Sequence, residues 1–262
     1  MTLDLSELVT DWDESGEEIP SRVVTDAQGG EWLQLRVDLG VLQMQPSGRP
    51  DGRNYHSHTS VLDYIRHERS INGLVSESDW DELRRELEQF NFRRLTLAGV
   101  AEHALRDENE AGARGYLERA VLDIEHCLNI LALARKAGVD ADDDDLTHST
   151  PISMLVFNRA RMRVRLCVID QRYEDAIEET QRGADELRQS LSSERLSDEE
   201  IERDPGLSYL NQLIERLRKQ HGISSTLREK LNQAIEQEDF ERAAALRDQL
   251  RRRSRPGDEI CE

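Results

Sequence analysis

The chain has 262 residues, 34% of them charged and 5% aromatic, and its formal net charge is −19 at pH 7. This composition is typical of a helix-rich protein, and the excess of acids argues against direct binding to nucleic acid, which requires a basic surface. The sequence contains no run of about 18 apolar residues and no signal-peptide pattern at its start, and its three cysteines lie far apart. We therefore expect a cytoplasmic protein that contacts neither membrane nor nucleic acid.

The N-terminal quarter of the chain predicts an arm and a small β-containing domain. Residues 1–20 contain seven acids and no base, so we expect an exposed acidic arm. In the domain at residues 21–75, a turn-forming segment separates two runs of alternating apolar residues, and this pattern predicts a β-hairpin. Gly40 is expected to form a bulge, after which the second strand continues to Met44. A short helix is predicted from Ser60 to Arg66.

The middle of the chain, residues 76–195, predicts four helices in two successive helical hairpins. We expect Ser78 to cap the first helix and Gly138 to end the second. The dipeptide Thr150-Pro151 is expected to open the third helix, with proline in its first turn. The segment from Tyr173 to Ile177 resembles the start of the second helix of a tetratricopeptide repeat, although the spacing between the pairs exceeds the 34 residues of that repeat. The predicted domain is therefore α-helical and TPR-like, with a groove for peptide or helical partners.

Residues 196–222 predict a connecting segment that contains one longer helix. Ser197 and Glu200 have the spacing of a capping box. Pro205 is expected to interrupt the chain before a helix from Tyr209 to Gln220, and Gly222 follows at a position typical of a helix end.

The C-terminal segment, residues 223–256, predicts a short antiparallel helical hairpin. An apolar stripe at helical spacing stops at Gln237–Asp239, where Asp239 is placed to cap a second helix. That second helix carries Phe240 and a set of alanines on one face. Two helices this short bury little surface, so we expect the stripe to require a partner, either elsewhere in the chain or in another chain.

Several of these residues resemble the UVR motif (UvrB/UvrC motif). Phe240 stands at the aromatic position, Ala234, Ala243 and Ala244 at the small positions, and Arg247-Asp248 at the polar pair. The resemblance implies a non-catalytic protein contact, because in its known settings the motif joins the excision-repair subunits UvrB and UvrC, or occurs in Clp-type chaperone ATPases and the adaptor of a protein-arginine kinase. The residues that we expect to bind partners are Leu227, Leu231, Ala234, Phe240, Glu241, Ala243, Ala244, Arg247 and Asp248.

Signatures of catalysis or of cofactor binding are missing from the sequence. It has no phosphate-binding G-x-x-x-x-G-K-[ST], no G-x-S-x-G, no H-E-x-x-H and no C-x-x-C. We therefore expect no enzymatic activity, no cofactor and no zinc. The segment from Asp38 through Gly52 resembles the N-terminal part of bacterial UVR-motif proteins, a resemblance that implies no activity.

Three polar clusters leave alternatives open. In the cluster of Asp38, Arg49, Asp51, His56 and His58, the two histidines with a carboxylate as third ligand could hold a metal ion, but the turn-forming residues among them favour a structural turn. The acidic run 142–145 could attract a divalent cation, although a solvated linker is favoured because the Gly and closing Glu of a calcium loop are missing. The arginines 159, 161, 163 and 165 form a basic island that more often pairs with local carboxylates than with an external anion.

The sequence thus predicts a mainly α protein with a small N-terminal β-hairpin element, TPR-like helical hairpins and a C-terminal UVR hairpin. Its predicted function is that of a non-catalytic cytoplasmic adaptor or scaffold. Residues 225–255 contain eight bases and six acids, so this end differs in charge from the acidic body. The partners could be Clp-type, kinase-type or Uvr-type components, or a second copy. The alternative function is an accessory factor in nucleotide excision repair that contacts UvrB- or UvrC-like subunits.

Overall fold

The computed structural model describes residues 12, 19–71, 75–137, 151–194 and 196–253. The chain divides into two compact units, Met1–Leu166 and Cys167–Glu262. The boundary falls within helix α6 (Ile152–Ile169), inside the range that the sequence analysis assigns to one helical domain. Among the described residues, no helix combines the length and apolar character that crossing a bilayer requires.

The first unit begins with a three-stranded antiparallel sheet in the order β1 (Ser21–Thr25), β2 (Glu31–Val37) and β3 (Gly40–Met44). The predicted hairpin of β1 and β2 is confirmed. The predicted bulge at Gly40 is wrong, because the chain reverses through a two-residue turn and Gly40 pairs with Val37 at the start of β3. The alternation of side chains along the sequence does not distinguish a continuing strand from a tight reversal, so the pattern alone could not show the turn.

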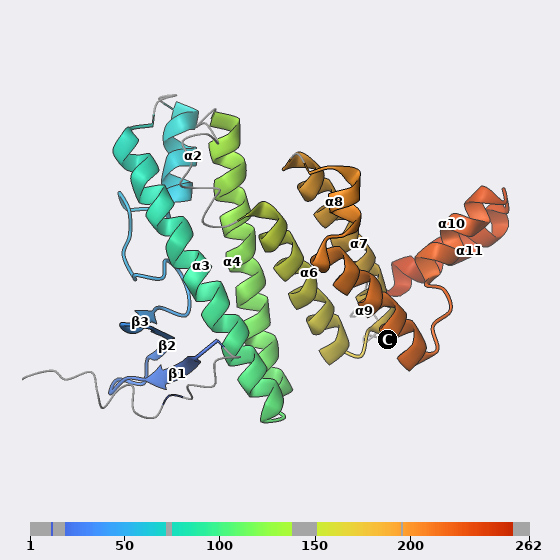
Figure 1. Ribbon diagram of the computed structural model, residues 1–262, viewed down its shortest axis with the longest axis horizontal. Helices are drawn as coiled ribbons and strands as arrows, with labels where there is room; N and C mark the ends of the chain where they lie inside the picture. The colour runs from blue at the N-terminus through green and yellow to red at the C-terminus, as the bar shows by residue number, and fades with distance from the viewer. Residues whose placement is uncertain (1–11, 13–18, 72–74, 138–150, 195, 254–262) are drawn as a thin grey trace, which may run out of the picture. The chain divides into compact units, whose positions relative to one another are not determined.

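One face of the sheet packs against helix α3 (Glu77–Arg106), which lies between the sheet and helix α4 (Glu110–Ala137) in Figure 1. Leu33, Leu35 and Met44 are buried on this inner face. A Cβ atom at Gly99 of α3 would clash with the Ser21 hydroxyl, so glycine at this position lets β1 approach the helix.

Helices α3 and α4 confirm the first predicted helical hairpin. The predicted cap at Ser78 is wrong: Ser76 is the N-cap, because its side chain accepts from the backbone N–H of Asp79 and the Asp79 carboxylate accepts in return from the Ser76 backbone. The predicted helix end at Gly138 and the acidic run 142–145 lie outside the described residues.

A buried ion pair joins the two helices of this hairpin. Arg93 Nε and Nη2 lie 2.8 Å and 2.6 Å from the two carboxylate oxygens of Asp123, and both side chains are 5% exposed. Arg93 also donates to the carbonyls of Gln45 and Gly48, which ties the loop after β3 to α3. Burial raises the pKa of Asp123, and the hydrogen bonds from Arg93 oppose that rise.

The second unit contains helices α7 (Tyr173–Ser193), α8 (Asp198–Glu202) and α9 (Pro205–His221), and within this unit the main partner of α7 is α9. The capping box of Ser197 and Glu200 is confirmed at the start of α8. The predicted helix start at Tyr209 is wrong: Asp204 caps α9 by accepting from Leu207, and Pro205 is its first residue. Proline suits that position because the missing N–H would have had no partner within the helix.

The TPR-like character of the middle stays a prediction. The segment from Tyr173 to Ile177 does begin α7, as the resemblance implies. However, α3 alone has 30 residues, nearly the whole length of a 34-residue repeat. The short helix predicted near Ser60 is α2 (Val61–Ile71), which also packs on α3.

Candidate protein-interaction hairpin

The chain ends its described part in an antiparallel hairpin of α10 (Leu227–Glu236) and α11 (Phe240–Arg253), which lie side by side in Figure 1. Thr226 begins α10 with a capping box: its hydroxyl accepts from the Glu229 N–H, and the Glu229 carboxylate accepts from the Thr226 N–H. Asp239 accepts from the Arg242 N–H at 3.1 Å, which confirms the predicted cap of the second helix. Local capping therefore defines both helix starts.

The predicted apolar stripe on α10 packs against α11 and forms the core of the hairpin. Ala234 of α10 and Ala243 and Leu246 of α11 are its buried residues, and Leu227 and Leu231 pack against them. The alanines allow the two helices to approach closely, so a core of only three buried side chains can hold the pair. Four of the residues expected to bind partners, Leu227, Leu231, Ala234 and Ala243, thus help to form the hairpin's own core.

The remaining predicted binding residues lie largely at the surface. Phe240 is 70% exposed, Glu241, Arg247 and Asp248 are exposed, and Ala244 is half-buried. The Arg247 guanidinium lies 3.3 Å from the carboxylate of its neighbour Asp248, so these two charges are paired with each other.

Ile235, which is not among the residues expected to bind partners, is 51% exposed. Ile235 and Phe240 stand on opposite sides of the turn that joins α10 to α11, and together they make the apolar part of the hairpin tip. Helical spacing does not indicate this exposure, because Ile235 lies four residues after Leu231, which packs against the hairpin core.

The charge of the hairpin is unevenly distributed. The segment 235–241 around the turn contains four acids and no base, and these acids, Glu236, Glu238, Asp239 and Glu241, are exposed. Of the exposed bases on the hairpin, Arg242 directly follows this segment in the first turn of α11, and Arg228, Arg247 and Arg251 lie farther from the turn. The tip therefore presents two apolar side chains surrounded by negative charge.

Glu229 fixes the base of the hairpin to the helices before it in the second unit. Its Oε1 atom accepts from Arg218 Nη2 of α9 at 2.5 Å and from Gln181 Nε2 of α7 at 2.7 Å. Partial burial raises the pKa of Glu229, but the hydrogen bonds from Arg218, the Thr226 backbone and Gln181 outweigh it, so the pKa lies below its ordinary value. Arg218 also donates to the Ser224 carbonyl at 2.6 Å, which holds the segment before α10.

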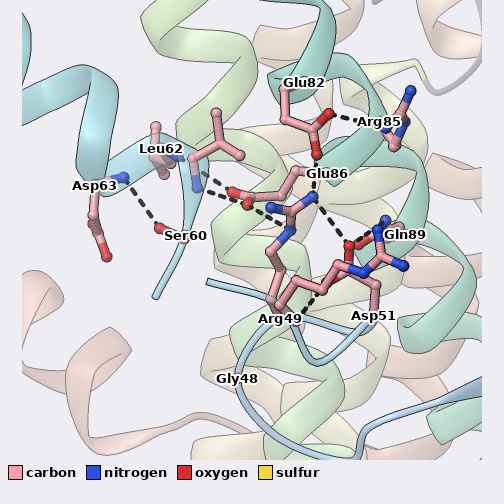
Figure 2. A network of polar contacts seen from close by, with 12 residues as sticks. Gly48, Arg49, Asp51, Ser60, Leu62, Asp63, Glu82, Arg85, Glu86 and Gln89 are labelled. Carbon is pink, nitrogen blue, oxygen red and sulfur yellow. Dashed lines mark hydrogen bonds and ion pairs between the residues drawn. The ribbon is translucent and has the colours of Figure 1, made fainter. Parts of the chain in front are cut away.

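The first of the three polar clusters separates into different places in the structure. Arg49 is buried and pairs with Glu82, Glu86 and Asp51, as Figure 2 shows. The Asp51 carboxylate lies 3.2 Å from Arg49 Nη2. Asp38 lies apart from these residues, in the turn between β2 and β3.

Glu86 is the centre of this network and is fully buried. Its carboxylate accepts from the backbone N–H groups of Val61 and Leu62 at 2.7 Å and 3.3 Å, at the start of α2 (Figure 2). It also lies 2.8 Å from His126 Nε2 of α4. One carboxylate thereby caps α2, neutralises Arg49 and contacts α4. The role of these residues is to hold the loop after β3 and the start of α2 on α3.

His56 and His58 belong to a tight turn and not to the Arg49 network. Tyr55 and His58 exchange two backbone hydrogen bonds, and His56 stacks on the ring of Tyr64 with 4.7 Å between centroids. Within the ranges that the structure describes, no group of three or more His, Cys, Asp and Glu side chains has an arrangement suited to a metal ion. The backbone hydrogen bonds and the stacking on Tyr64 give these two histidines structural contacts within the turn.

The basic island on α6 pairs locally, as the sequence analysis favoured. Arg163 Nη2 lies 2.5 Å from the Glu125 carboxylate, and Arg165 Nη2 lies 2.9 Å from that of Glu102. Arg161 lies over the ring of Phe157.

Comparison with protein-family models matches residues 225–252 to the UvrB/uvrC motif. These residues run from Ser225, just before the N-cap of α10, to the last but one residue of α11, so the resemblance read from Ala234, Phe240 and the alanines is confirmed. No curated protein and no solved structure matches the chain. The chain therefore carries a UVR hairpin, a helical interaction motif, at the end of a fold whose other parts have no matched relative.

Proposed function

We propose that the protein is a non-catalytic cytoplasmic adaptor that binds protein partners through the tip of its UVR hairpin. The observation that carries this proposal is the position of Phe240, which is 70% exposed on a hairpin whose own core is complete without it. A large aromatic side chain held in this way on a folded element is the usual form of a binding hot spot.

The exposed area of Phe240 sets the binding free energy that a partner can gain by covering it. Full burial of a phenylalanine side chain is worth about 1.5–3 kcal/mol, and most of the Phe240 surface is still available to a partner. Ile235 adds a second apolar contact on the other side of the turn. Because Phe240 contributes little to the hairpin core, truncating it removes binding energy without unfolding the element that presents it.

The alternative function is an accessory role in nucleotide excision repair, favoured by the match to the UvrB/uvrC motif. In both cases the hairpin contacts protein, and the identity of the partner separates the two. Clp-type or kinase-type components as partners would support the adaptor, and UvrB- or UvrC-like subunits would support the repair factor. Neither role requires direct contact with nucleic acid, which the net charge of −19 opposes.

The experiment is affinity capture from native lysate with the tagged full-length chain and its Phe240→Ala variant. Leu39→Ala is the matched control, because Leu39 is also an apolar side chain, 99% exposed, but lies in the first unit. We expect Phe240→Ala to weaken capture by about 2–4 kcal/mol in binding free energy, or roughly 30-fold or more, and Leu39→Ala to leave it unchanged. Equal capture by all three proteins would contradict a role of the hairpin tip.

A further inference from the structure

The face of the sheet turned away from α3 carries a row of polar side chains across all three strands. Arg22, Gln34 and Gln43 are in register on β1, β2 and β3. Arg22 Nε donates to Gln34 Oε1 at 2.9 Å, and Gln34 Nε2 donates to Gln43 Oε1 at 2.8 Å. Because side chains alternate along a strand and Leu33 and Leu35 point to α3, this row lies on the outer face.

This outer face is covered at Arg22 by a residue of the N-terminal acidic segment. The Arg22 guanidinium carbon lies 4.3 Å from the centroid of the Trp12 ring, within the range of a cation–π contact. Trp12 is 9% exposed, and Gln34 beside Arg22 is 7% exposed. The expectation of an exposed arm over residues 1–20 is therefore wrong at Trp12.

We propose that the outer face of the sheet is a docking site for an aromatic side chain flanked by acids, and that its occupant is the chain's own N-terminal segment, anchored by Trp12. The indole stacks on the guanidinium, and Gln34 holds that guanidinium in place by accepting from its Nε atom. Asp11, Asp13 and Glu14 flank the anchor in the sequence, so the segment has the charge that Arg22 attracts. While Trp12 is docked, the face is closed to other ligands of the same chemistry.

The short connection between Trp12 and β1 makes docking within the chain efficient. A ligand tethered by a few residues has an effective concentration on the order of 1 mM. If the free segment binds with a Kd of about 50 μM, the tethered one occupies the face about 95% of the time, and a competing peptide binds the intact chain roughly 20-fold more weakly than a chain with the face open.

The test measures binding of a labelled peptide of residues 4–18 to two full-length proteins, the wild type and Trp12→Ala, by fluorescence anisotropy. We expect micromolar binding to Trp12→Ala and roughly 20-fold weaker binding to the wild type. Replacing Arg22 by Ala in the Trp12→Ala chain should reduce binding at least fivefold, and the same peptide with Trp12→Ala should not bind. Equal binding to both proteins, or none to either, overturns the proposal.

A second measurement does not depend on the folding of the Trp12→Ala chain. In a chain with Trp32→Phe and Trp80→Phe, Trp12 is the remaining tryptophan, and the proposal expects its fluorescence to be shielded from acrylamide. Adding Arg22→Ala should expose it, and quenching as fast as that of a free peptide overturns the proposal. A wild-type protein that sediments as a dimer, with Trp12→Ala a monomer, would place the segment on a second copy and would also overturn docking within one chain.

Discussion

Leu246→Ala should unfold the UVR hairpin while the rest of the chain stays folded. Leu246 is the largest of the three buried side chains in the hairpin core, and it is 8% exposed. Truncating a buried leucine costs about 2–5 kcal/mol, and we expect the lower end, about 2–3 kcal/mol, because a seam this small can partly collapse. Helices of 10 and 14 residues with so small a core have only a few kcal/mol of local stability, so the loss removes most of it.

Hydrogen exchange measured by mass spectrometry reports this loss segment by segment. A change of 2–3 kcal/mol corresponds to a fall in protection of roughly 30- to 150-fold in α10 and α11, with α3 and α4 unchanged. Gln249→Ala on the exposed face of α11 is the control and should leave the hairpin protected. If Leu246→Ala lowered protection equally in α3 and α4, the hairpin would not be a separate unit of stability and the reasoning would be refuted.

Three further predictions test the contacts that support the hairpin and the first unit. Glu229→Gln should loosen the base of the hairpin, and in the wild type the contacts of Glu229 should weaken as the pH falls below the ordinary Glu pKa of 4.5, because a carboxylate with a lowered pKa stabilises the fold only while it is ionised. Hydrogen exchange in the first turn of α10 measures both effects, and Glu236→Gln is the exposed control. Arg93→Met should lower the free energy of unfolding in urea by about 3–5 kcal/mol, because it leaves Asp123 buried and unpaired. This loss of stability should shrink at acid pH, where Asp123 takes up a proton, and a loss below 1 kcal/mol would contradict the buried pair. Cys127, whose pKa burial raises to about 12, should resist alkylation at pH 8 in the native protein and react after denaturation, and rapid native labelling would show that the core around it opens.

Features that depend on neighbouring residues could be predicted from the sequence. The cap at Asp239, the capping box of Ser197 and Glu200, and the helix end at Gly222 each involve a side chain or backbone conformation within a few residues. The seam between α10 and α11 was also predictable, since small residues at helical spacing favour close packing. Ser76 and Ser78 are each followed three residues later by an acid, Asp79 and Asp81, so the local pattern does not decide between them, and in the structure Ser76 forms the cap.

Features that depend on distant residues could not be predicted. Glu86 accepts from backbone N–H groups, forms an ion pair with Arg49 and contacts His126, and these residues lie far apart in the sequence, so no local pattern indicates that this acid is buried. The exposure of Phe240 could not be predicted either, because its helical spacing puts it on the same face as Ala243 and Ala244. Phe240 is the first residue of α11, and side chains tilt toward the N-terminus of a helix, so it extends past the seam instead of into it.

Photo-crosslinking from position 240 tests the central claim most directly. A benzoylphenylalanine placed at Phe240 in the full-length chain should form a covalent adduct with a partner protein in living cells, because the side chain at this position is expected to lie inside the interface. The same group at Leu39, which is fully exposed in the first unit, should form none. Adducts from Leu39 and none from position 240 would contradict the account and place the interaction surface outside the hairpin.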